Sequence, residues 1–287
     1  MSGFGKPASR RRMAARVLGI ALCCGWSAAW PLPPAPAVAS ATAGATRPAV
    51  PLRIGVTPGP HAEIAEEVRR IAAARGLAIE VRRFDDPARI DAALAAGRLD
   101  AASFEDARQL AATRRAHGYA LSSVATTVSL PLALYSRRLQ GLSQLRPSAT
   151  VVIPADRRGA SRALVLLQNE NLLKLREAAG LDATRRDVLG NRLGLRLVER
   201  PAGELYAALD HADLVAMDRE TAQRAGLQPG RDSIGTEDAR SPYASVLTIR
   251  DADRGQPWVG ELVAAYHAEP LAHFLLVRYQ DSVRRPW

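Results

Sequence analysis

The sequence predicts an α/β fold in which parallel strands are covered by helices. From Leu52 onward, short apolar segments alternate with longer segments whose apolar residues recur every three or four positions. Repeated strand–helix units of this kind are typical of parallel sheets. Of the 287 residues, 47% are hydrophobic, which is enough for one large core or two smaller ones. Ligands of such folds bind beyond the carboxyl ends of the strands, so we expect functional residues to follow strands.

The first strand–helix unit illustrates the pattern. The segment LRIGV at 52–56 is a short apolar run, and the segment 61–75 places Ile64, Val68 and Ile71 on one helical face. Other short apolar runs predict strands at 78–84, 99–104, within 121–136, and at 149–154, 195–199, 213–217 and 244–250. The segments between them predict helices, among them 87–97, 105–117, one that begins near 159–161, 257–268 and 270–280.

The composition argues against several classes of site. The net charge is +10, but the first 39 residues contain five basic residues and no acid, so the remainder carries +5. Aromatic residues make up 5% of the chain and are not interleaved with basic clusters, which argues against nucleic-acid binding. Both cysteines lie near the N-terminus, at Cys23 and Cys24, and the five histidines show no HExxH spacing. We therefore expect no disulfide after residue 24, no metal site and no cofactor.

Residues 1–39 have the pattern of an export signal. A basic segment precedes an apolar run at 17–30, which is shorter than the roughly 20 residues needed to span a bilayer. A proline-rich stretch follows, and then the small-x-small pattern Ala37, Val38, Ala39. We expect a mature protein that begins near Ser40 in the periplasm, with a disordered linker at 40–50. The segment SRRRMA also loosely resembles a twin-arginine signal.

The alternative to a cleaved, soluble mature protein is an exported protein with a lipid anchor. A lipidated cysteine needs a small residue before it, whereas Leu22 precedes Cys23 and Cys23 precedes Cys24. Both positions are therefore poor matches to a lipidation signal.

Arg162 is an unusual residue for its position. The expected helix begins near 159–161, so Arg162 lies beside the partial positive charge of the helix N-terminus. An anion held by both the helix end and the guanidinium would explain the arginine. A surface arginine in an arginine-rich chain is the alternative.

Five segments of the sequence carry a resemblance to a known family. They are LRIGVTPGPHAEIAEEV, AALAAGRLDAASFEDARQLA, LYSRRLQGLSQLR, VVIPADRRGASRALVLLQNENLLKLRE and SPYASVLTIRDAD. Together they resemble the NlpA/MetQ family, the substrate-binding proteins of methionine-type ABC importers, over about 52–280 with order and spacing retained. The resemblance implies a two-lobed periplasmic-binding-protein (Venus flytrap) fold with the ligand in the cleft, with lobe one at about 50–134 plus 241–287 and lobe two at about 135–240.

The resemblance also implies a set of ligand-binding residues. The family arginine that grips the ligand carboxylate corresponds to Arg162, and the aromatic wall to Phe104. The position near the ligand amine corresponds to Asp218. The other candidates that match family positions are Asp106, Gly159, Tyr243, Ser245 and His61.

The pocket departs from the family pattern at several of these positions. A family histidine is Asp106 here, a tyrosine is Gln109, and an asparagine is Asp218. Gly159 and Ser245 also replace family asparagines. Carboxylates at 106 and 218 would suit a ligand with extra positive charge. Each residue also has a structural interpretation: Phe104 could belong to the core, Asp218 could cap a helix, His61 could lie at the surface, and Asp106 could be a solvated acid near a helix N-terminus.

The resemblance implies a monomeric, non-enzymatic binding protein that captures methionine or a related amino acid or dipeptide and delivers it to an ABC permease. A degenerate family member that acts as an envelope sensor or structural protein is one alternative. A serine hydrolase is another, because the segment from Gly159 to Ala163 nearly matches the G-x-S-x-G elbow around Ser161. Acids and histidines follow it in hydrolase order, at Asp213, Asp218, His267 and His273.

Overall fold

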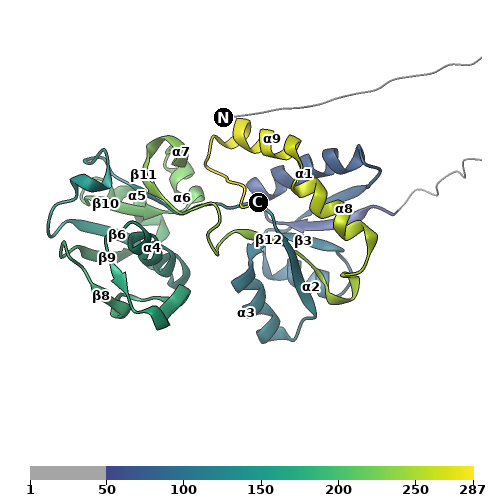
Figure 1. Cartoon of the computed structure of the whole chain (residues 1–287), viewed down its shortest axis with the longest axis horizontal. Helices are drawn as coiled ribbons and strands as arrows, with labels where there is room; N and C mark the ends of the chain where they lie inside the picture. The colour runs from purple at the N-terminus through teal and green to yellow at the C-terminus, as the bar shows by residue number, and fades with distance from the viewer. Residues whose placement is uncertain (1–49) are drawn as a thin grey trace, which may run out of the picture. The chain divides into compact units, whose positions relative to one another are not determined.

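The computed structural model describes residues 50–287, which form two five-stranded sheets and a two-stranded hairpin (Figure 1). The expectations about the export signal, its cleavage, Cys23, Cys24 and most of the linker lie outside the described residues. Within 50–287, none of the helices has the length and apolar character needed to cross a membrane.

The first sheet has the strand order β2-β1-β3-β12-β4. Its strands are β1 (Leu52–Val56), β2 (Ile79–Arg83), β3 (Ala101–Asp106), β4 (Leu121–Thr126) and β12 (Ser245–Arg250). Its helices are α1 (Pro60–Ala73), α2 (Ala88–Ala95), α3 (Ala107–His117), α8 (Pro257–Tyr266) and α9 (Glu269–Tyr279).

Helices cover both faces of this sheet. Alternate residues of a strand point to opposite faces, and in β12 Leu247 packs with α1, α8 and α9 whereas Val246 packs with α2 and α3. Figure 1 shows α1, α8 and α9 grouped together, apart from α2 and α3. Each face therefore has its own apolar core, and the carboxyl ends of β1 and β3 are left for a site.

The second sheet has the strand order β11-β5-β10-β6-β9. Its strands are β5 (Ala133–Tyr135), β6 (Thr150–Pro154), β9 (Arg196–Arg200), β10 (Leu214–Met217) and β11 (Ser233–Thr236). Its helices are α4 (Arg157–Asn169), α5 (Leu205–Ala208), α6 (Arg219–Arg224) and α7 (Pro229–Asp232), and the hairpin is β7 (Lys174–Leu175) with β8 (Val188–Gly190). In β10, Leu214 packs with α4 and Val215 packs with α5, so this sheet is also covered on both faces.

The sheets are mixed, which corrects the expectation of purely parallel sheets. β12 runs antiparallel to β3 and β4, and β5 runs antiparallel to β10 and β11. These strands directly follow or precede the two passages of the chain between sheets, at 127–132 and 237–244. Within one sheet, a strand–helix–strand crossover makes the two strands parallel. β5 and β12 instead enter their sheets from the other sheet, so the alternation of strands and helices in the sequence does not determine their direction.

We propose that the lobe boundaries lie at these two passages. Lobe one would then surround the first sheet and lobe two the second. The division lies a few residues from the one implied by the resemblance, because β5 already pairs with β10 and β11 from residue 133.

Candidate functional site

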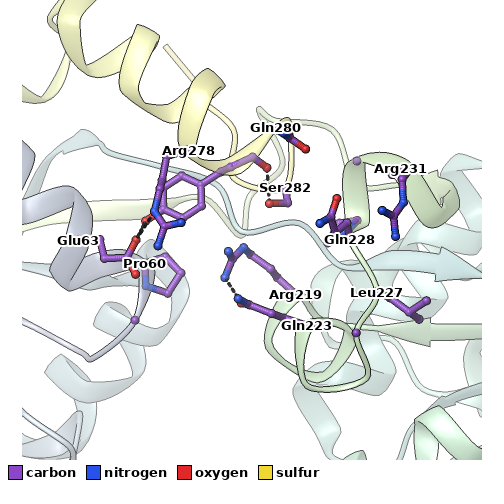
Figure 2. Close-up of a pocket in the computed structure, with 15 residues that line it drawn as sticks. Pro60, Glu63, Arg219, Gln223, Leu227, Gln228, Arg231, Arg278, Gln280 and Ser282 are labelled. Carbon is purple, nitrogen blue, oxygen red and sulfur yellow. Dashed lines mark hydrogen bonds and ion pairs between the residues drawn. The ribbon is translucent and has the colours of Figure 1, made fainter.

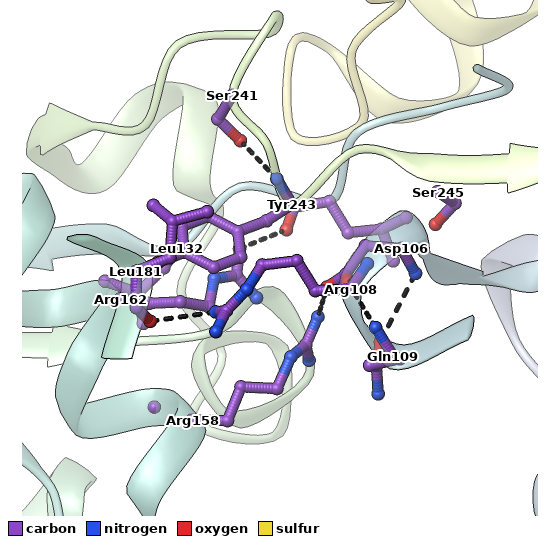
Figure 3. Close-up of polar contacts among 12 residues, drawn as sticks. Asp106, Arg108, Gln109, Leu132, Arg158, Arg162, Leu181, Ser241, Tyr243 and Ser245 are labelled. Carbon is purple, nitrogen blue, oxygen red and sulfur yellow. Dashed lines mark hydrogen bonds and ion pairs between the residues drawn. The ribbon is translucent and has the colours of Figure 1, made fainter. Parts of the chain in front are cut away.

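Arg162 is buried in the second turn of α4, because this helix begins at Arg157 and not near 159–161 as the sequence predicted. Its guanidinium is already paired with a carboxylate. Its Nε donates to Glu237 Oε1 at 3.0 Å, and its Nη2 donates to Glu237 Oε2 and to the Leu130 carbonyl, the latter at 3.1 Å. The Tyr243 ring lies against it, with 4.8 Å between the guanidinium carbon and the ring centroid (Figure 3). Burial lowers the pKa of Arg162 and the bonds to Glu237 raise it, with a net rise, so the side chain is charged.

The remaining nitrogen of Arg162 defines what the site can bind. Within residues 50–287, Nη1 has no hydrogen-bond acceptor. A guanidinium presents five N–H donors in a fixed plane, so Nη1 can still hold a carboxylate. The Glu237 charge offsets that of Arg162, and a ligand carboxylate would therefore be held mainly by directed hydrogen bonds.

Glu237 is the partner of Arg162 in the candidate site, and the sequence analysis missed it. It is buried, and besides Arg162 it accepts the Leu132 N–H at 2.8 Å. Glu237 and Leu132 belong to the two passages between the sheets, so one carboxylate ties both passages to α4. The only available signal was indirect, because a buried arginine requires a counter-charge.

Asp106 is buried at the end of β3 with both oxygens occupied. Its Oδ1 accepts the N–H groups of Arg108 and Gln109, each at 2.9 Å, and caps α3. Its Oδ2 accepts Nη2 of Arg158 in α4 at 2.5 Å. The carboxylate therefore joins the first sheet to α4, and a direct ligand contact by Asp106 stays a prediction.

Arg108 makes a second set of contacts between the same two regions. Its Nη1 donates to the Leu181 carbonyl at 2.8 Å, and its Nη2 lies 2.7 Å from Asp182 Oδ1. Figure 3 shows Arg108, Arg158 and Arg162 close together near Tyr243. Each of these arginines has a carboxylate partner, at Asp182, Asp106 and Glu237 respectively.

Ser161 lacks the geometry of a hydrolase nucleophile. Its Oγ donates to the Leu181 carbonyl at 2.6 Å, and no histidine of the described residues bonds to it. His267 Nε2 is instead 2.8 Å from the Thr126 carbonyl oxygen. The Ser–His pair that the hydrolase alternative needs is not formed within 50–287.

His61 and Ser245 are brought together at the carboxyl end of β1. His61 Nδ1 is 3.0 Å from Thr57 Oγ1, and His61 Nε2 is 3.1 Å from Ser245 Oγ. Burial lowers the pKa of His61 to about 4. The imidazole is therefore neutral near pH 7 and contributes a polar, uncharged wall.

Three other candidates have local structural roles. Asp218 is exposed and caps α6 by accepting the Thr221 N–H at 2.7 Å. Phe104 is half-buried against the apolar core beneath α2 and α3. Gly159 donates its N–H to Asp156 at 2.8 Å, and a Cβ at Gly159 would lie 2.6 Å from Pro154 Cβ. A direct ligand contact by these residues stays a prediction.

Two further acids, Asp91 in α2 and Glu105 in β3, are buried next to Asp106. Burial, together with the charges of Asp91 and Asp106, raises the pKa of Glu105 to about 8, and burial raises that of Asp91 to about 6. Arg158 opposes the rise at Glu105, and Thr113 and His117 oppose it at Asp91. Within residues 50–287, Asp91 Oδ1 and Glu105 Oε1 are buried without a hydrogen-bond donor.

We expect the folded protein to lose stability as the pH rises from about 5 to about 8. Both pKa values lie above the ordinary values of 3.8 and 4.5, so these two acids bind more protons in the folded state in this range, and rising pH favours unfolding. The lowered pKa of His61 acts in the opposite direction below about pH 6.5, but one group offsets only part of the effect of two. Glu105→Gln removes one of the charges, so its melting temperature should depend less on pH and exceed the parent's at pH 8, by roughly 1–3 kcal/mol in unfolding free energy. Thermal melts from pH 5 to 8 measure this. The exposed Glu261→Gln is the control, and a parent melting temperature that does not fall over this range would contradict the prediction.

A family model described as NlpA lipoprotein matches residues 52–287. The chain belongs to the NlpA lipoprotein family. It is 31% identical over 252 residues to Outer membrane lipoprotein 2 of Mannheimia haemolytica, and the aligned region covers 88% of this chain and 91% of the relative. It is 32% identical over 237 residues to the probable D-methionine-binding lipoprotein MetQ of Vibrio cholerae, over 82% of this chain and 88% of the relative.

The solved structure of a nutrient-binding protein from Burkholderia cenocepacia bound to methionine is similar to this NlpA-family chain. The TM-score is 0.67 with 32% sequence identity, over 82% of this chain and all of that one. The predicted family and the predicted periplasmic-binding-protein fold are confirmed. The roles of individual site residues stay predictions.

Proposed function

We propose that this protein is an extracytoplasmic solute-binding protein that captures methionine or a closely related amino acid and delivers it to an ABC permease. The relative from Vibrio cholerae is named a probable D-methionine-binding protein, and the similar structure from Burkholderia cenocepacia holds methionine. The proposal includes export from the cytoplasm, a binding rather than a catalytic role, and a monomer. The relatives named lipoproteins favour the alternative of a lipid anchor at Cys23 or Cys24.

Arg162 carries this proposal at the level of the site. It is a buried cation whose Nη1 has no acceptor within residues 50–287 and can donate to a ligand carboxylate, and it lies beside the Tyr243 ring. The neutral His61 and Ser245 would add polar contacts. A guanidinium held rigid by Glu237 binds a carboxylate without first losing side-chain entropy, because the side chain is already ordered.

We propose a ligand with an uncharged side chain. Free carboxylates at 106 and 218 would have favoured a cationic ligand, but Asp106 bonds to Arg158 and caps α3, and Asp218 caps α6. Arg158 therefore compensates the Asp106 charge, and the exposed Asp218 carboxylate is bound at one oxygen by the Thr221 N–H.

Titration calorimetry on the purified mature protein tests the proposal. After co-purified ligand has been removed, D- or L-methionine is expected to bind saturably, and lysine and arginine much more weakly. Tight binding of lysine or arginine would contradict the uncharged-ligand proposal. The absence of heat with every amino acid would contradict amino-acid capture and favour a degenerate family member.

A further inference from the structure

A second polar cavity lies apart from the cluster around Arg162. It has a volume of about 530 Å³, within the usual range for small-molecule sites. One wall comes from the start of α1 and the end of α9, and the other from α6 and α7 (Figure 2). None of the eight predicted ligand-binding residues lines it.

The cavity lining carries an excess of positive charge. Arg219, Arg231 and Arg278 line it, with Glu63 as the acidic lining residue. Arg278 Nε donates to Glu63 at 3.0 Å, and Arg231 Nε donates to Asp232 at 2.7 Å. These two arginines are therefore neutralised.

Arg219 differs from its neighbours because it has no carboxylate partner within residues 50–287. Its Nη1 donates to Gln223 Oε1 at 2.9 Å, and its guanidinium carbon lies 5.1 Å from the centroid of the Tyr279 ring. Its Nε is buried without an acceptor in the described part of the chain. Burial lowers the pKa of Arg219, and the charge of Glu63 opposes this only in part, so the guanidinium is partly desolvated.

The unsatisfied edge of Arg219 has the geometry of an anion-binding fork. Nε and Nη2 lie on one side of a guanidinium and can donate two parallel hydrogen bonds to a carboxylate or a phosphate. Arg162 uses this same edge to bind Glu237. In Arg219 this edge has no protein acceptor among the described residues, but its Nε is buried, so Nη2 is the donor that an anion can reach. Figure 2 shows the side chain extending from α6 toward Pro60 and Arg278.

We propose that this cavity is a second binding site, for a small anionic group such as a carboxylate or a phosphate, held by Arg219 through Nη2. The bound anion would accept a hydrogen bond from Nη2 and would compensate the charge. The cavity volume leaves room for a ligand larger than the anionic group itself. This site is independent of the amino-acid site proposed at Arg162.

Titration of the mature protein with inorganic phosphate and, separately, with acetate tests this inference. The titrations are followed by calorimetry and thermal shift at constant ionic strength, with chloride as the reference. We expect saturable binding of at least one anion, and the comparison of phosphate with acetate distinguishes the two chemistries. Arg219→Met should weaken that binding about tenfold or more, and Arg224→Met should not. Arg224 is the matched control because it is exposed, lies on the same helix and does not line the cavity.

Two further measurements keep the test decisive. Removal of a half-buried cation without a salt bridge should leave the fold intact, which circular dichroism checks. Arg219→Lys, which keeps the charge but loses Nη2, should bind the anion more weakly than the parent and provides the test if Arg219→Met does not fold. Equal anion affinity in the parent and in the folded Arg219 variants, or no saturable binding of either anion, would overturn the inference. Methionine binding is measured in parallel, so failure of this site is distinguishable from failure of the proposed function.

Discussion

Replacing Arg162 by methionine in a Glu237→Gln background is expected to weaken methionine binding by roughly 2–5 kcal/mol, the cost of removing one member of a buried charge pair. This corresponds to tens- to thousands-fold in affinity. The ligand carboxylate loses the Nη1 donors, and little water can replace them at a buried position. The Glu237→Gln substitution is included because Arg162→Met alone would leave the buried Glu237 charge unpaired.

Two single variants serve as controls for this result. Glu237→Gln alone keeps Arg162 and removes its neutralising charge, so it should bind methionine at least as tightly as the parent. Arg157→Met removes an exposed arginine of the same helix and should leave the affinity unchanged. Calorimetry on the parent, the double variant and the two single variants measures these affinities. If the double variant bound methionine as tightly as the parent does, Arg162 would not hold the ligand carboxylate.

Glu237→Ala is expected to destabilise the fold by about 3–5 kcal/mol, the range for breaking a buried ion pair by removal of one partner. Glu237 accepts hydrogen bonds from Arg162 Nε and Nη2 and from the Leu132 N–H. Truncation strands a buried guanidinium and a backbone donor without solvent to replace the lost acceptor. The melting temperature should fall by roughly 6–20 °C, at about 2–4 °C per kcal/mol for a chain of this size.

The neighbouring residue offers a matched control for Glu237→Ala. Asp238 is exposed and its carboxylate bonds to the Arg240 N–H in a turn, so Asp238→Ala should change the melting temperature by only a few degrees. If Glu237→Ala and Asp238→Ala had equal melting temperatures, the buried Arg162–Glu237 pair would not be a determinant of stability.

Local pattern was sufficient for most elements of the fold. The run at 52–56 became β1 with those bounds, because a short apolar segment between polar residues has few alternatives. The start of α4 was placed too late, since the Asp156 cap begins the helix at Arg157. The short strands β7, β8 and β11 were missed because segments of two to four residues carry no measurable alternation.

The site was predictable to the extent that it depends on local sequence. The acid at Asp106 was recognised as a residue suited to a helix N-terminus, and it does cap α3. Its partner Arg158 and the partner of Arg162, Glu237, come from positions 52 and 75 residues away. Such pairs depend on how the chain passes between the sheets, which no local pattern encodes. One of the two aspartates that suggested a cationic ligand, Asp106, is paired for the same reason, whereas Asp218 caps α6 locally.

The pairing of the ligand carboxylate with Arg162 is tested most directly by a double-mutant cycle between protein and ligand. Calorimetry would compare the Glu237→Gln protein with the Arg162→Met, Glu237→Gln protein, each titrated with methionine and with methioninamide, which lacks the carboxylate. A direct contact predicts that loss of the carboxylate weakens binding strongly when Arg162 is present and much less when it is absent, with a coupling of roughly 1–3 kcal/mol. Additive effects, with a coupling within about 0.5 kcal/mol of zero, would show that the carboxylate is held elsewhere.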